Sequence, residues 1–350
     1  MGQNSSSFFG RHWRGILTVI TFLALGAFVY ALRHQIIGTI GNLERANFWI
    51  LLAVIPLQAL HYHFVARMYR RLFRLLGNKV SYKFLYRTAL ELNFVNLVFP
   101  SAGVSGFSYF GIRMRSKGVT PGKATLVQTM RFVLLFIAFQ LLLFIGLFLL
   151  ALNGRASNLM ILIASSLATF LLVGTLLLTY IIGSEKRIDS FFTLITKLLN
   201  RIIQVVRPNN PETINVSRAQ GAFKDYHGNY KILQTNYKKL FRPLLYALFI
   251  NLSEVLTIYV VFAAFGEWVN PGAVIIAYAV ANFAGLISVL PGGVGIYEAL
   301  MTGVLAAGGV PAALSLPVIV AYRIMSMGVQ LPPGAYLYHT AINEKDADAR

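Results

Sequence analysis

The sequence predicts an all-α polytopic membrane protein with about six full spans and two broken helical segments, re-entrant or hairpin. Hydrophobic residues make up 57% of the chain and charged residues 12%. Several apolar runs reach 18 residues, about the length that a helix needs to cross a bilayer core of ~30 Å. Two further apolar segments are interrupted by proline and glycine, which disfavour a continuous helix. These observations together predict the fold class.

The full spans are expected at about 15–32, 47–66, 124–152, 159–182, 242–265 and 313–338. The first run lacks a small-x-small cleavage site, so we expect a retained signal anchor. Residues 15–338 then form a single membrane domain between tails 1–14 and 339–350. Met1-Gly2 fits the loose pattern for myristoylation, although a disordered polar tail is the simpler interpretation.

The basic residues predict the orientation of the chain. With the N-terminus in the cytoplasm, 26 of the 31 lysines and arginines fall on the cytoplasmic side, and Arg33, Arg45 and Arg155 fall outside. This asymmetry predicts that both termini are cytoplasmic, in the cell (inner or plasma) membrane. The net charge of +19 is therefore attributed to the inner face and not to a nucleic-acid partner. The chain has no cysteine, which excludes disulfides and thiolate chemistry.

The two broken segments occupy about 84–112 and 271–309, and each contains a proline followed by glycines. The residues concerned are Pro100, Gly103 and Gly106 in the first and Pro291, Gly292, Gly293 and Gly295 in the second. Non-helical backbone at membrane depth is tolerated only where it is buried in protein or lines a water-filled cavity. The breaks therefore predict a substrate site.

Three crossings separate the two breaks, so the broken segments enter from opposite sides, as in an inverted-topology repeat. We expect repeat halves at about 47–152 and 242–338, with Arg131 and Arg323 at matching distances after their prolines. Residues 184–240 form a cytoplasmic insertion. Within it, the apolar spacing of 187–206 predicts an amphipathic helix. This helix lies either on an anionic leaflet, which 184–207 would contact, or on the cytoplasmic ends of the spans. A second, more polar helix is expected at 217–240.

The stretch from Pro291 to Glu298 resembles the Pro-Gly-Gly-x-Gly-x-x-Glu motif of the lysylphosphatidylglycerol synthase transmembrane (flippase-like) family. Asn93 to Gly118 and the following Arg131 are similar to that family's first motif. The resemblance implies the membrane module alone, without the aminoacyl-transferase domain, and a link to flipping of a modified phospholipid. Many relatives carry an acidic residue where this chain has Phe107 and Ser108, so the resemblance does not imply a mechanism with a carboxylate at both breaks.

Few ionisable residues fall within the apolar segments: Glu91, Arg131, Glu254, Glu298 and Arg323. Guanidinium groups suit bidentate phosphate binding, so Arg131 and Arg323 are candidate ligands for a lipid phosphate. The alternative is a structural arginine–glutamate pair, with Glu254 or Glu298 as acceptor and Glu91 as a further partner. Glu298 has two possible roles. It binds a cationic group or a proton, or it stabilises the N-terminus of its own helix. Asn93, Asn96, Asn282 and Ser288 either line a polar route or hydrogen-bond between helices.

The function that these residues favour is translocation of an anionic or aminoacylated phospholipid, or of a lipid-linked headgroup, without a cofactor. Two alternatives stay open: a membrane-embedded transferase acting on a lipid-linked substrate, and an ion-coupled transporter of small solutes. Gly103-Val104-Ser105-Gly106 matches the surroundings of a rhomboid-type serine, but that chemistry needs a histidine at membrane depth, and we expect none there. His61 and His63 are interpreted as interfacial anchors, not metal ligands. A homo-oligomer is compatible with the sequence.

Overall fold

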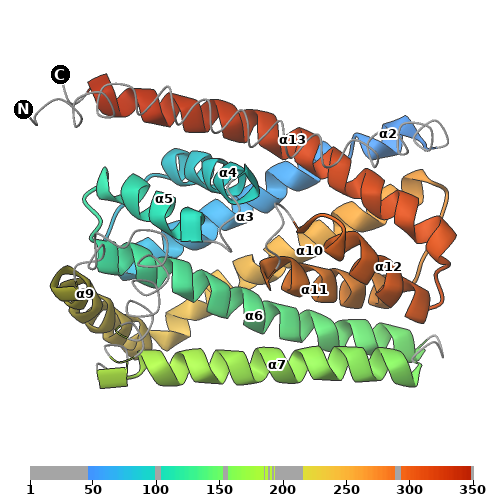
Figure 1. Ribbon diagram of the computed structural model, residues 1–350, viewed down its shortest axis with the longest axis horizontal. Coiled ribbons are helices and arrows are strands. Elements are labelled where there is room, and N and C mark those ends of the chain that lie inside the picture. Colours follow the sequence, from blue (N-terminus) through green and yellow to red (C-terminus); the bar gives the residue numbers. More distant parts are fainter. Residues whose placement is uncertain are drawn as a thin grey trace, which may run out of the picture.

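The computed structural model describes residues 46–98, 104–152, 157–184, 186, 187, 190, 193, 216–287 and 293–347, and the secondary structure of this part of the chain is helical (Figure 1). Five of its helices are long and apolar enough to cross a membrane: Phe48–Leu75, Pro121–Leu152, Asn158–Ile182, Tyr237–Ala264 and Ala312–Asn343. The all-helical membrane class is confirmed, and these helices match five of the expected spans. The expected first span and the Met1-Gly2 tail lie outside the described residues.

Helix α3 (Val54–Leu75), which follows the short α2 (Phe48–Leu51), is longer than the sequence suggested. We expected this span to end near Ala66. Instead Met68, Tyr69, Leu72 and Phe73 are buried, so the apolar stripe continues at helical spacing while arginines occupy the other positions. The basic run is thus mostly helix, and α4 begins at Tyr82.

Each broken segment consists of two helices shorter than a full span. The first comprises α4 (Tyr82–Val98) and α5 (Val104–Arg115), and the second comprises α11 (Pro271–Ile287) and α12 (Ile296–Ala307). Lengths of 17 and 12 residues correspond to ~25 and ~18 Å, less than the ~30 Å core. In each segment the two helices pack against each other (Figure 1). Re-entrant geometry stays a prediction, which these lengths support.

The helices of the two expected halves correspond in order and length. Helices α3, α4, α5 and α6 (Pro121–Leu152) have the counterparts α10 (Phe241–Ala264), α11, α12 and α13 (Ala312–Ala347). Helices of one half also pack against helices of the other half: α6 packs against α11, α4 against α13, and α3 against α10 (Figure 1). The inverted repeat remains a prediction, which this reciprocal packing favours. Helix α7 (Asn158–Ile182) packs on the outside of α6.

The insertion contains α9 (Val216–Thr235), followed by a short 3-10 helix at Tyr237–Leu240. The second expected helix is therefore present but ends before Leu240. Helix α9 packs on α6 with Tyr226 and Leu233 buried, and this burial raises the pKa of Tyr226 to about 12. Its apolar face is thus covered by protein. Most of the expected amphipathic helix at 187–206 lies outside the described residues.

Candidate functional site

A layer of polar side chains separates the two large apolar cores of the described chain. One core surrounds α4 and α5, and the other surrounds α11 and α12. Along α3, Gln58 lies between Val54 of the second core and Tyr62 of the first; along α10, Glu254 lies between Ile250 of the first and Val255 of the second. Polar groups so far from water require partners.

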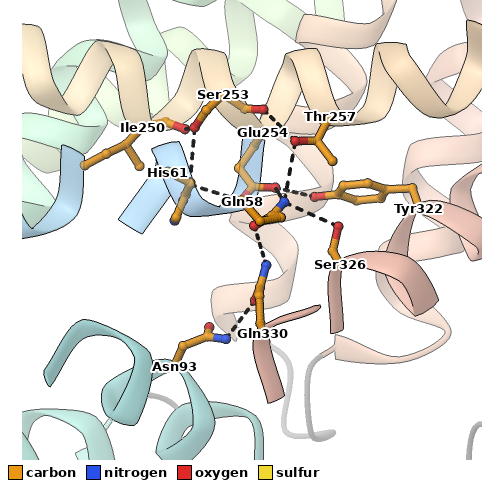
Figure 2. Close-up of polar contacts among 10 residues, drawn as sticks. All are labelled: Gln58, His61, Asn93, Ile250, Ser253, Glu254, Thr257, Tyr322, Ser326 and Gln330. Carbon is orange, nitrogen blue, oxygen red and sulfur yellow. Dashed lines mark hydrogen bonds and ion pairs between the residues drawn. The ribbon is translucent and has the colours of Figure 1, made fainter. Parts of the chain in front are cut away.

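Gln58 joins four helices through this layer (Figure 2). Its Nε2 lies 3.4 Å from Glu254 Oε2, 3.5 Å from Thr257 Oγ1 and 3.4 Å from Ser326 Oγ. Its Oε1 accepts from Gln330 Nε2 at 2.6 Å, and Gln330 Oε1 accepts from Asn93 Nδ2 at 2.8 Å. One continuous network therefore connects α3, α4, α10 and α13, the helices that bring the two halves together.

Glu254 is the acidic member of the layer. Its Oε1 lies 3.0 Å from His61 Nδ1, and its Oε2 accepts a hydrogen bond from the Tyr322 hydroxyl at 2.7 Å. Ser253 Oγ is 3.5 Å from the same His61 nitrogen. The interpretation of His61 as an interfacial anchor, and the expectation that no histidine falls within a span, were wrong. Because α3 extends to Leu75, His61 lies in the middle of the Phe48–Leu75 span.

The second break carries a buried ion pair. Arg323 Nη1 donates to Glu298 Oε1 at 2.5 Å, and Glu298 Oε2 accepts from the Gly295 backbone N–H at 2.7 Å. Glu298 and Arg323 are 3% and 7% exposed. One carboxylate thus stabilises the start of α12 and neutralises a cation on α13. Gly293 and Gly295 have φ of 65° and 85°, which favours glycine, while Pro291 and Gly292 lie outside the described residues.

A separate ion pair anchors the helices beside the first break. Glu91 on α4 accepts two hydrogen bonds from Arg113 on α5, from Nε at 2.8 Å and from Nη2 at 2.9 Å, and a third from the Tyr109 hydroxyl at 2.8 Å. Glu91 was expected to form an ion pair, and it does so with Arg113, a partner that the sequence did not indicate because the contact depends on how α5 folds back on α4. A Cβ atom at Gly106 would collide with the Asn96 side chain. Pro100 and Gly103 lie outside the described residues.

Arg131 on α6 differs from these arginines because it forms no ion pair with a carboxylate in the part of the chain that the structure describes. Its Nη1 donates to the Tyr69 hydroxyl at 3.2 Å, and that hydroxyl donates to Gln128 Oε1 at 2.8 Å. Its Nε is buried without a hydrogen-bond partner among the described residues.

The sequence matches the model of a known family over most of its length. The model of the lysylphosphatidylglycerol synthase TM region matches residues 15–334. The chain belongs to this family. A UPF0104 membrane protein of Methanothermobacter thermautotrophicus is 31% identical over 171 residues, which cover 48% of this chain and 51% of that relative. The alignment thus spans about half the length of that relative. Family membership and the apolar helices identify a multi-pass membrane protein.

The polar layer contains residues that we did not predict from the sequence: Gln58, Thr257, Tyr322, Ser326 and Gln330. Their spacing was a usable signal, because Tyr322, Ser326 and Gln330 recur every four residues and therefore share a helix face. Asn93 does bond between helices, whereas Asn282 Nδ2 donates to Tyr278 O of its own helix at 3.0 Å. Within the described residues no group of histidines and acids could hold a metal ion.

Proposed function

We propose that this protein translocates a phospholipid with an anionic or aminoacylated headgroup, or a lipid-linked headgroup, between the leaflets of the cell membrane, as a flippase or scramblase. Membership in the lysylphosphatidylglycerol synthase TM family supports a lipid-related function. In this proposal both termini are cytoplasmic, the headgroup crosses through the polar layer, and the two broken segments flank its route.

The observation that carries the proposal is the uncompensated charge of Arg131. Arg113 and Arg323 each face a buried carboxylate, but among the described residues Arg131 has only neutral partners. An arginine at the centre of a membrane helix costs about 2.5–3.5 kcal/mol on insertion scales, so an anion that arrives from outside the protein would recover part of this cost. The phosphate of a lipid suits the planar guanidinium.

The surroundings of Arg131 suit a lipid rather than a small ion. Phe107 on α5 stacks on Phe132 at 5.7 Å between ring centroids, and Phe136 contacts Phe283 on α11 at 5.5 Å. In this proposal these half-buried rings supply the apolar surface that an acyl chain requires beside the charge. The amides of the polar layer replace the water that a headgroup loses. Glu254 supplies a carboxylate for the ammonium of an aminoacylated headgroup.

The test measures exchange of fluorescent headgroup-labelled lipids between leaflets in proteoliposomes, with anionic, zwitterionic and aminoacylated lipids compared. We expect Arg131→Gln to slow exchange of the anionic lipid about tenfold or more, the effect of losing ~1.4 kcal/mol of binding. Arg87→Gln removes an exposed arginine and should leave the rate unchanged. Wild-type exchange no faster than in protein-free vesicles, or an Arg131→Gln rate equal to wild type, contradicts the proposal.

A second candidate, proton-coupled transport of a small solute, rests on the contact between His61 and Glu254. A histidine and a carboxylate 3.0 Å apart in a membrane interior form a site that can bind a proton. This candidate predicts proton flux without lipid exchange, lost in Glu254→Gln. The transferase alternative gains no specific support from the described residues.

A further inference from the structure

The corner where α3 turns into α4 contains a basic pocket far along α3 from the polar layer. Its volume is about 480 Å³, and its lining consists of Arg70, Arg74, Gly77, Asn78, Lys79, Val80 and Ser81. Gly77 makes this corner possible, because its φ of 82° belongs to the left-handed region that disfavours other residues. We refer to this site as the corner pocket.

The charge of the corner pocket is entirely positive. Arg70 and Arg74 are one helical turn apart on α3 and therefore share a face, and Lys79 follows the turn. No acidic residue lines the pocket, and none of the three cations forms an ion pair within the described chain. Three cations around one concavity repel each other, and an anion between them would relieve that repulsion.

Two of the residues that line the corner pocket also have a polar atom without a hydrogen-bond partner. Arg70 Nε and Asn78 Oδ1 are buried, and neither has a hydrogen-bond partner among the described residues. A phosphate oxygen satisfies the guanidinium donor, and a hydroxyl on or beside the phosphate satisfies the amide acceptor. An occupant that carries both groups therefore fits this site better than chloride or a carboxylate does.

We propose that the corner pocket is an anion site that binds a hydroxyl-bearing phosphate group, from a lipid headgroup of the facing leaflet or from solution. The basic residues of this corner lie on the side that the charge distribution places in the cytoplasm, where anionic lipids attract basic groups. The site is separate from Arg131 and does not depend on lipid translocation. It anchors the α3–α4 corner, and hence the first broken segment, to the membrane surface.

The test compares two triple variants of the full-length chain that each lose two arginines and one lysine. The pocket variant is Arg70→Gln, Arg74→Gln and Lys79→Gln. The matched control is Lys83→Gln, Arg87→Gln and Arg115→Gln, three exposed positions in the same part of the chain outside the pocket lining. Binding is measured with soluble short-chain phosphatidic acid and with inorganic phosphate, and sedimentation with vesicles compares phosphatidylcholine with and without phosphatidic acid.

We expect the pocket variant to bind short-chain phosphatidic acid at least about tenfold more weakly than wild type, and the control less than about twofold, because direct phosphate contacts outweigh general surface charge. Binding of the lipid but not of inorganic phosphate identifies a lipid headgroup as the source, and equal binding identifies free phosphate. Equal losses in both triple variants, or no binding of either probe by wild type, overturn the proposal. Lys79→Gln alone, at an exposed position, must show a smaller loss in the same direction if the triple variant misfolds.

Discussion

Replacement of Glu298 by glutamine should destabilise the protein more than removal of the whole ion pair with Arg323. Glutamine keeps the shape of the side chain, and its oxygen can still accept from the Gly295 N–H, so the start of α12 retains its cap. The negative charge 2.5 Å from Arg323 Nη1 is lost, however, and the guanidinium is only 7% exposed. Burial at this level makes the loss of the carboxylate costly.

The structure allows the size of this effect to be worked out. Breaking one half of a buried ion pair leaves an uncompensated charge and costs about 3–5 kcal/mol. Replacing both members removes that charge, so Glu298→Gln combined with Arg323→Met should cost only ~0–2 kcal/mol. Each single variant should cost about 3–5 kcal/mol, so the double-mutant cycle should give a coupling energy of at least about 4 kcal/mol.

The assay is reversible unfolding in mixed micelles, followed by tryptophan fluorescence, for wild type, both single variants and the double variant. Glu267→Gln is the control, because Glu267 forms no ion pair in the described chain, and it should change the free energy of unfolding by less than ~0.5 kcal/mol. If Glu298→Gln costs no more than this control or the double variant, the charge of Arg323 is solvated and the argument from burial is refuted.

Two further changes test the packing of the broken segments. A Cβ at Gly272 on α11 would collide with the Gly146 carbonyl oxygen on α6, so Gly272→Ala should lower the free energy of unfolding by ~1–3 kcal/mol, while Gly303→Ala, which has open space, should be neutral or stabilising by up to ~1 kcal/mol. Glu91→Gln leaves the buried Arg113 without its carboxylate and should cost ~3–5 kcal/mol; hydrogen exchange that is unchanged in α5 would contradict this.

The spans could be predicted from sequence because the signal for each is local. Apolar length alone located α6, α7, α10 and α13, and the proline–glycine clusters marked where α4 and α11 end. The end of α3 was missed because its last turns combine exposed arginines with buried Tyr69 and Phe73. A prediction based on the number of charged residues assigns such a segment to a connection between spans. The segment is nevertheless helical, because one face of the helix is apolar and buried.

The candidate site could be predicted only in part. The sequence identified the costly charges, since an ionisable residue in an apolar segment stands out by itself. It named Glu298 as a possible acceptor for an arginine, and Glu298 does pair with Arg323. It did not identify Arg113 as the partner of Glu91, which depends on how α5 folds back on α4. It also overlooked Gln58 and Gln330, because a single neutral amide in a span is common and becomes informative only when other polar groups face it.

The sequence by itself determined the membrane class, five of the spans, the two interruptions and the family resemblance, because hydropathy, proline and glycine act on the chain over a few residues. Only the tertiary structure decided which charges are neutralised, that His61 and Glu254 meet in the interior, and that Arg131 has no carboxylate partner in the described chain. These features depend on contacts between residues far apart in sequence, such as Gln58 and Gln330. The geometry of packed helices, and not local preference, selects those contacts.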